Sequence, residues 1–334
     1  MFIRNTDEDA ATGERSLLIS AKHEIMDKQH IYIYKKTYYE PKDFVDSRYD
    51  PSFSPAVYPG ESISVSVKIP ISSNDRFAAA MFVHDLHSDK IYHSDITVLD
   101  NGQWKKLTYK IPRCNGALLD KMGVVLEKAV TAVCVEKDTL FAAPMKVCYI
   151  DDLCCFGTPD YTLCLSNENV ELWNTFHKEI SQFTRFKGLT YLECGSLHLS
   201  CADYGECYTG KDTWTDYSAS FGVTPIKGQY HMVNFRVQGA EKSYAAGLLP
   251  DGTFALLKKK HEYTILKRTE FEWKIGKKYT ITCSVEKNDI TVSVEDAVLN
   301  FTDEKDTYYR NGAVGLSVME GSHLSCEEIS IGKC

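Results

Sequence analysis

Hydrophobic and polar residues alternate with a period of two along most of the chain, and amphipathic helical periodicity over ten or more residues is nearly absent. Residues 64–69, Ser-Val-Ser-Val-Lys-Ile, show the alternation, and residues 77–83 form a continuous apolar run typical of a buried strand. Short strands at regular spacing are typical of β-sandwiches. The pattern therefore predicts an all-β protein.

Turn residues divide the strands. Asn101-Gly102 predicts a hairpin between a strand ending at Leu99 and one starting at Trp104, because this dipeptide tolerates positive backbone φ angles. Residues 250–253 and 287–289 predict two further turns in the second half. Around the second of these, six residues are expected to share the inward face of two strands: Ile281, Cys283, Val285, Ile290, Val292 and Val294.

Gly157-Thr158-Pro159-Asp160 is the expected domain boundary, because glycine and proline interrupt both flanking strand patterns. Residues 1–157 and 158–334 are each long enough for one domain. The sequence thus predicts two tandem jelly-roll β-sandwiches.

The chain has 334 residues, a formal net charge of −8 and no strongly basic block, which argues against nucleic acid and anionic membranes as partners. Its longest apolar run has seven residues, too short to span a bilayer. The first residues contain no secretory signal pattern, so a cytoplasmic location is expected. The twelve cysteines include no Cys-x-x-Cys pair, so we expect mostly reduced, buried thiols and no zinc site.

Common catalytic signatures for acyl transfer, phosphate binding, zinc hydrolysis and dinucleotide binding are absent from the sequence. Asp151 and Asp152 follow each other on an expected strand and should point to opposite faces, so they cannot act as a pair in glycoside cleavage. One of them is a candidate calcium ligand; the alternative is two solvated acids at a strand end. Residues 84–95, rich in histidine and aspartate, are read as a solvated hairpin in preference to a metal site.

The strongest local feature is the alternation in residues 231–238. Val233, Phe235 and Val237 are expected to face the core, which would leave Asn234, Arg236 and Gln238 as a row of hydrogen-bonding groups on the opposite face. The preceding segment, residues 200–210, adds acids and aromatic rings beside this row. The candidate ligand-binding residues are Asn234, Arg236, Gln238, Glu206, Asp203, Tyr208 and Tyr244. The alternative is a structural ladder in which Glu206 pairs with Arg236.

The second half resembles the concanavalin-like jelly rolls, in particular 3-keto-disaccharide hydrolase-type domains and levan-binding modules. Four segments carry this resemblance: Trp214-Thr215-Asp216-Tyr217, residues 234–240 (Asn-Phe-Arg-Val-Gln-Gly-Ala), residues 243–247 (Ser-Tyr-Ala-Ala-Gly) and residues 312–318 (Gly-Ala-Val-Gly-Leu-Ser-Val). The sequence of residues 182–323 also resembles the region that follows the catalytic domain in some bacterial ADP-ribosylglycohydrolase-family proteins.

The first half resembles the galactose-binding-like jelly rolls of carbohydrate-binding modules attached to xylanases. Residues 13–17 match their opening strand, 102–107 their tryptophan strand and 149–153 their final strand. An acid of that final strand commonly binds structural calcium, which the resemblance transfers to Asp151 or Asp152.

The catalytic site of the ADP-ribosylglycohydrolases cannot be transferred, because this chain lacks their helical domain and aspartate-rich magnesium motifs. The sequence therefore predicts a non-catalytic accessory protein that binds carbohydrate or a ribose-containing ligand and has a catalytic hydrolase domain as a candidate partner. One alternative is a glycoside hydrolase or lyase that uses acids near Asp203, Glu206 and Asp216. The other is a purely structural docking module.

Overall fold

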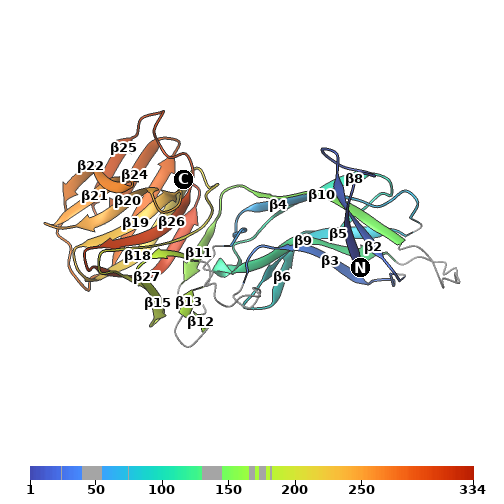
Figure 1. The fold of residues 1–334 in the computed structure, drawn as a ribbon, viewed down its shortest axis with the longest axis horizontal. Coiled ribbons are helices and arrows are strands. Elements are labelled where there is room, and N and C mark those ends of the chain that lie inside the picture. The colour runs from blue at the N-terminus through green and yellow to red at the C-terminus, as the bar shows by residue number, and fades with distance from the viewer. Residues whose placement is uncertain are drawn as a thin grey trace. The chain divides into compact units, whose positions relative to one another are not determined.

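The computed structural model describes residues 1–23, 25–39, 55–73, 75–129, 145–164, 170–172, 178–180 and 183–334. These residues form antiparallel β-sheets with one short 3-10 helix, η2 (Cys114–Gly116), which confirms the all-β prediction (Figure 1). The chain divides into two compact units. The N-terminal unit comprises residues 1–37, 61–111 and 119–156, and the C-terminal unit comprises 38–60, 112–118 and 157–334.

The main part of the C-terminal unit starts at Gly157, and two segments from the first half of the chain also belong to this unit. One of them includes Tyr58, which is fully buried in the core of the C-terminal unit. The Tyr58 ring stacks on Tyr161 at 5.7 Å, and its hydroxyl accepts a hydrogen bond from the Gly210 amide at 2.8 Å. Two consecutive sequence ranges therefore do not describe the units completely.

Two five-stranded sheets make up the N-terminal unit. The first has the order β1 (Phe2–Thr6), β2 (Ser16–Ala21), β10 (Met145–Phe156), β4 (Ser62–Lys68) and β8 (Trp104–Lys110). The second has the order β3 (His30–Lys36), β9 (Leu119–Lys128), β5 (Phe77–Asp85) and β6 (Lys90–His93), with β7 (Thr97–Val98) also paired to β5.

The hydrophobic patterns in the sequence agree with the strands of this unit, except at one expected turn. The alternating segment 64–69 falls mostly within β4, and the apolar run 77–83 lies in β5, which is buried along nearly its whole length. The hairpin expected at Asn101-Gly102 is wrong, although Gly102 does have a positive φ of 81°. The strands on either side of this turn belong to different sheets, since β7 pairs with β5 and β8 pairs with β4.

Two larger sheets form the C-terminal unit (Figure 1). The eight-stranded sheet has the order β15 (Leu189–Glu193), β16 (Ser196–Ser200), β27 (His323–Gly332), β18 (Tyr217–Lys227), β23 (Tyr279–Glu286), β24 (Asp289–Val294) and β25 (Ala297–Thr302), with β11 (Tyr161–Cys164) also on β27. The seven-stranded sheet has the order β14 (Thr184–Lys187), β17 (Tyr204–Thr209), β26 (Ala313–Met319), β19 (Tyr230–Val237), β20 (Lys242–Leu249), β21 (Thr253–Lys260) and β22 (Glu262–Glu270). A short separate ladder joins β12 (Val170–Leu172) to β13 (Lys178–Ile180).

Side chains from the inner faces of both sheets fill one hydrophobic core. The six residues predicted to share an inward face on β23 and β24 all belong to it, and β20 and β21 form the hairpin predicted at residues 250–253. The ten cysteines whose side chains the structure describes are free thiols. No helix in the described ranges is long and apolar enough to cross a membrane.

Candidate functional site

A β-bulge in β19 breaks the row of polar residues that the sequence predicted. Asn234 pairs with Gly315 on β26, but Val237 pairs with Ala313, so the register shifts between them. Arg236 lies inside this bulge with a positive φ of 48°. The prediction that Asn234, Arg236 and Gln238 share one face is therefore wrong, because an extra residue in a strand redirects the side chains that follow it.

Arg236 is fully buried at one end of the C-terminal sandwich. Its guanidinium donates hydrogen bonds to the backbone carbonyls of Thr215, Lys287 and Tyr309, and it contacts the Asp216 carboxylate at 3.0 Å. The alternative of a structural ladder had assumed that Arg236 pairs with Glu206, and this pairing does not occur. Its donors join loops from both sheets, and none of its surface is exposed.

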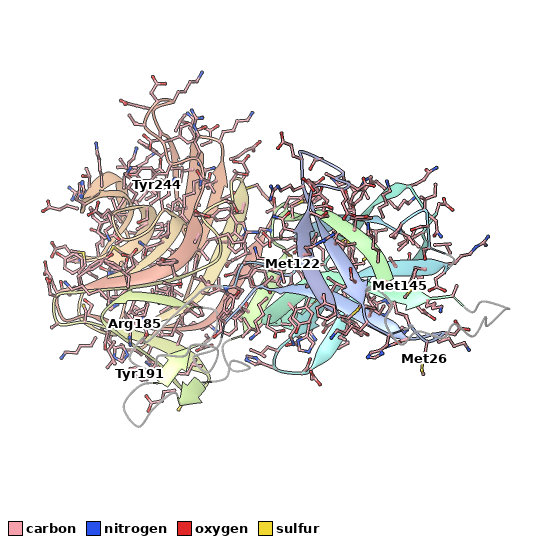
Figure 2. All side chains as sticks on the ribbon, turned by 45° about the vertical axis from the view of Figure 1, so that its right-hand side comes forward. Met26, Met122, Met145, Arg185, Tyr191 and Tyr244 are labelled. Atoms are coloured by element: carbon pink, nitrogen blue, oxygen red, sulfur yellow. The ribbon has the colours of Figure 1, made fainter. Side chains whose placement is uncertain are left out.

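Tyr244 and Gln238 occupy two other environments. Tyr244, labelled in Figure 2, is fully buried. Its ring stacks on Phe235 at 5.5 Å and its hydroxyl donates to Asp303. Gln238 is exposed and donates to the Asn311 carbonyl at 2.9 Å. Tyr244 thus belongs to the core, while Gln238 lies on a surface loop away from the buried polar groups.

Glu206 and Asn234 do come together, on the face of the seven-stranded sheet that is turned away from the core. Their neighbours in sequence, Cys207, Val233 and Phe235, belong to the core, so strand alternation directs Glu206 and Asn234 to the other face. Both are almost completely buried, with 1% and 0% of their surfaces exposed. A buried polar cluster on the second face of a sheet needs partners, and the structure supplies them.

The first part of this cluster is an ion pair between β17 and β21. Lys259 Nζ lies 2.9 Å from Glu206 Oε2, and both groups also contact the Tyr204 hydroxyl at 2.6 Å. The lysine ammonium lies 4.4 Å from the centre of the Tyr204 ring. The other carboxylate oxygen, Glu206 Oε1, is buried and has no hydrogen-bond partner in the described structure. One strong acceptor is therefore left unused.

The second part surrounds Asn234. Its amide donates to the Tyr263 hydroxyl at 2.8 Å and to the Ser243 hydroxyl at 3.3 Å, and it accepts from the Ser317 hydroxyl at 2.7 Å. The Tyr263 and Ser317 hydroxyls are 3.0 Å apart. We call the buried polar residues of both parts the polar floor: Glu206, Asn234, Ser243, Lys259 and Ser317.

Half-buried tyrosines cover this floor. We define the tyrosine face as Tyr204, Tyr208, Tyr230, Tyr263 and Met319. Met319 pairs in the ladders with both Tyr204 and Tyr230, so these three residues form one row across β17, β26 and β19. Gly315 pairs with Tyr208, and a Cβ at this glycine would lie only 2.4 Å from the Cys207 carbonyl. The absence of a side chain at Gly315 thus lets β26 lie close to β17 beside Tyr208.

The environment favours the protonated form of Tyr204, Tyr208 and Tyr263. Burial raises the pKa of Tyr204, and the negative charges around it, including Glu206, raise it further. Burial also raises the pKa of Tyr263 and of Tyr208. A protonated phenol both donates and accepts hydrogen bonds, so the face offers neutral aromatic rings with polar edges.

Of the seven sequence-predicted residues, Glu206, Asn234 and Tyr208 lie on this face. Asp203 comes just before β17, largely exposed, 3.3 Å from Lys187. The sequence analysis missed Lys259, Tyr263, Tyr204 and Ser317. Alternation in β21 around the buried Leu256 would have placed Lys259 opposite the core, but only the ladder order brings it near Glu206.

Asp151 and Asp152 lie in β10 beside another bulge, and Asp152 has a positive φ of 53°. The prediction that they point apart is wrong, because both carboxylates contact the same loop. Asp151 Oδ2 accepts hydrogen bonds from the Ala11 and Thr12 amides at 2.9 and 3.0 Å, and Asp152 Oδ1 accepts from the Thr12 hydroxyl at 2.5 Å. Within the described ranges no three histidine, cysteine or acidic side chains are grouped to hold a metal ion. Calcium binding here stays a prediction.

The histidine-rich segment forms the expected hairpin, β5 to β6. Asp85 accepts hydrogen bonds from the His87 amide and the Ser88 hydroxyl, which stabilises the turn. His84 is buried between two carboxylates, with Nδ1 2.5 Å from Asp120 and Nε2 2.9 Å from Asp89. These contacts explain the segment as a hydrogen-bonded turn.

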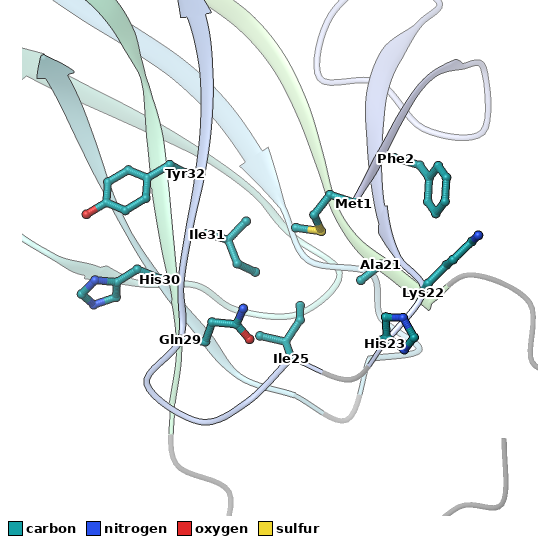
Figure 3. Close-up of a pocket in the computed structure, with 10 residues that line it drawn as sticks. All are labelled: Met1, Phe2, Ala21, Lys22, His23, Ile25, Gln29, His30, Ile31 and Tyr32. Carbon is teal, nitrogen blue, oxygen red and sulfur yellow. The ribbon is translucent and has the colours of Figure 1, made fainter. Parts of the chain in front are cut away.

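The N-terminal unit also contains an open cavity of about 520 Å³. It is bordered by β1, the end of β2 and the start of β3, with Met1, Ile25 and Ile31 directed toward its middle (Figure 3). One of its polar groups, Gln29, is already bonded to the Met26 amide at 3.0 Å. The cavity therefore has an apolar centre without converging charged groups.

The burial of His231, at the edge of the C-terminal core, predicts that the stability of the C-terminal unit depends on pH. His231 is fully buried, Nδ1 has no partner within the described structure, and burial lowers its pKa to about 4 from 6.5. The neutral ring is therefore favoured in the folded state, and the unfolded chain binds a proton first as the pH falls. We expect the C-terminal unit to lose up to about 3 kcal/mol between roughly pH 6.5 and pH 4 from this residue.

Urea unfolding at a series of pH values measures this loss. His231→Gln removes the titrating group and should flatten the dependence. An equal slope in the variant and the unchanged protein would contradict the assignment. A residual slope of the same sign is expected from His323, whose pKa is also lowered by burial.

The chain is similar to several known structures, although only at low sequence identity. No family model and no curated protein matches the chain. Similar solved structures include a carbohydrate-binding module, CBM66 from Bacillus subtilis (14% identity, TM-score 0.40, 45% of this chain and 96% of that one). They also include a Bacillus subtilis protein of unknown function with a galectin-like fold (12%, 0.39, 46% and 89%) and the Caenorhabditis elegans galectin LEC-6 (9%, 0.30, 45% and 96%). Similarity at this level assigns no function to this chain, so its function has to be argued from its own residues.

Proposed function

We propose that the C-terminal unit binds carbohydrate on the tyrosine face and does not cleave it. The observation that carries the proposal is a set of half-buried tyrosine rings on one face of a sheet, two of whose hydroxyls are held by buried polar groups beneath them. Sugar rings have apolar faces that stack on aromatic side chains and hydroxyls that need hydrogen-bond acceptors. This face offers both.

The polar floor holds two of the rings in place. The Tyr204 hydroxyl is fixed by Glu206 and Lys259, and the Tyr263 hydroxyl by Asn234 and Ser317. Rings that are already ordered lose little conformational entropy when a ligand binds, which improves affinity. In this proposal Asn234 and Glu206 each position a tyrosine, and the tyrosine hydroxyls supply the hydrogen-bonding groups for the sugar.

The arrangement of acids favours binding over hydrolysis. The buried acids described in this unit are Glu206 and Asp303, and they pair with Lys259 and Lys258. These lysines are neighbours on β21 and point to opposite faces of the sheet. Glycoside cleavage needs two carboxyl groups on either side of one bond, roughly 5 to 9.5 Å apart. The two buried acids cannot flank one substrate.

Calorimetric titration with separate sugar classes tests the proposal: monosaccharides, fructans, xylo-oligosaccharides and ADP-ribose. Tyr208→Ala and Tyr230→Ala should each weaken binding about tenfold, the equivalent of about 1.4 kcal/mol for a lost stacking contact. Tyr191→Ala, on β15 of the other sheet, is the matched control and should bind normally. Circular dichroism verifies that each variant is folded.

Binding by the two face variants that equals the Tyr191→Ala control would overturn the location of the site. Release of product from any of these sugars by the unchanged protein would overturn the non-catalytic assignment. Binding of ADP-ribose alone would identify a ribose-containing ligand and favour an accessory role beside an ADP-ribosylglycohydrolase-type catalytic domain. Thermal unfolding with calcium and with chelator tests the proposed calcium at Asp151 and Asp152, whose loss should lower the stability of the N-terminal unit.

A further inference from the structure

Two histidines meet on the outer face of the eight-stranded sheet. His198 lies on β16 between the core residues Leu197 and Leu199, and His323 starts β27 next to the core residue Leu324. Strand alternation therefore directs both imidazoles away from the core. His198 Nδ1 and His323 Nε2 are 2.9 Å apart, and both rings are half-buried and thus accessible to a small ion.

This separation equals that of two cis ligands on one metal ion. With metal–nitrogen bonds of about 2.0–2.1 Å, two nitrogens at 90° lie about 2.9 Å apart, and two at the tetrahedral angle about 3.3 Å apart. The observed 2.9 Å is a hydrogen-bond distance in the free protein and places both nitrogens close enough to share one ion, and imidazole ligands together with water suit Cu(II) and Ni(II). Each ring has to turn away from the hydrogen-bonded arrangement, by up to about 45°, so that both lone pairs converge on one point.

The surroundings hold the pair in place. Tyr191 on β15 stacks on the His198 ring at 4.9 Å with an angle of 9° between the planes. The same tyrosine ring lies 6.2 Å from His323. The negative charge of Glu193, two residues along β15, acts on His323. A stacked ring restricts one imidazole, and a nearby carboxylate favours a cation.

We infer that His198 and His323 form a chelating site for a divalent transition-metal ion of the Cu(II) or Ni(II) class, with water as the remaining ligands. In the free protein one facing nitrogen carries the proton of the hydrogen bond between the rings. On binding, that proton moves through solvent to the outer nitrogen of the same ring, and both facing nitrogens become metal ligands. The rings stay neutral throughout, and no redox step is involved.

Titration of the tag-free full chain with Cu(II), monitored by calorimetry and electron paramagnetic resonance, tests the inference. We expect one ion per chain with two nitrogen couplings in the spectrum. His198→Ala and His323→Ala should each weaken binding by at least roughly tenfold, because a single imidazole does not chelate. The double variant should lose less affinity than the sum of the two single losses, because each single variant already removes the chelate.

His261→Ala is the matched control, because His261 is an exposed histidine of the same unit. It should leave the affinity unchanged. Equal Cu(II) affinity in His198→Ala, His323→Ala and the control would overturn the inference, as would a spectrum with only one nitrogen coupling. Preference for Zn(II) over Cu(II) and Ni(II) would overturn the assigned metal class. The tyrosine face lies on the other sheet, so failure of this site leaves the carbohydrate proposal intact.

Discussion

Replacing Glu206 with glutamine is expected to destabilise the C-terminal unit by about 3–5 kcal/mol, because it leaves Lys259 as an unpaired buried cation. Both side chains are almost completely buried, at 1% and 5% exposure, and the ammonium of Lys259 lies 2.9 Å from the carboxylate. For a unit of this size the loss corresponds to a decrease in Tm of roughly ten degrees. Differential scanning calorimetry measures it as a shift of one unfolding transition.

Two controls separate charge burial from a general effect of substitution. Asp203→Asn removes the exposed partner of Lys187 beside the same strand, where the pair is 54% and 86% exposed, and should cost less than about 1 kcal/mol. Glu206→Gln combined with Lys259→Met removes both charges and should recover much of the stability. If the double variant were less stable than Glu206→Gln alone, the unpaired cation would not be the cause.

Arg236→Ala is expected to destabilise the same unit by about 3–5 kcal/mol, through lost hydrogen bonds and a cavity. The guanidinium is fully buried and serves the carbonyls of Thr215, Lys287 and Tyr309, which would be left without this donor. Urea unfolding measures the change in free energy. Arg236→Lys should recover only part of it, because an ammonium cannot reproduce the planar fork of donors.

Ligand titration of folded Arg236→Ala distinguishes this structural role from a role in binding. With the protein held well below its Tm, carbohydrate affinity should equal that of the unchanged protein. A loss of affinity in a variant of normal stability would return Arg236 to the ligand site. A stability change below about 1 kcal/mol would contradict the proposed role of its hydrogen bonds.

Local patterns were sufficient for the strands and for much of the C-terminal core. The alternation around residues 281–294 placed six inward side chains correctly, since a strand has a strict period of two and the core accepts only the apolar face. The same rule failed at Arg236 and Asp152. Each lies at or beside a bulge with a positive φ, and one additional residue reverses the face of the side chains after it.

The sequence by itself determined the all-β class and the alternating strands, and it singled out Glu206, Asn234 and Tyr208 as residues of interest. Only the tertiary structure decided which of them meet. Lys259 lies 53 residues from Glu206 along the chain, and three other strands separate β21 from β17 in the sheet. Likewise, 125 residues separate His198 from His323. Periodicity reports only the face of a strand, whereas strand order and sheet curvature determine which side chains share that face, and both depend on contacts between distant parts of the chain.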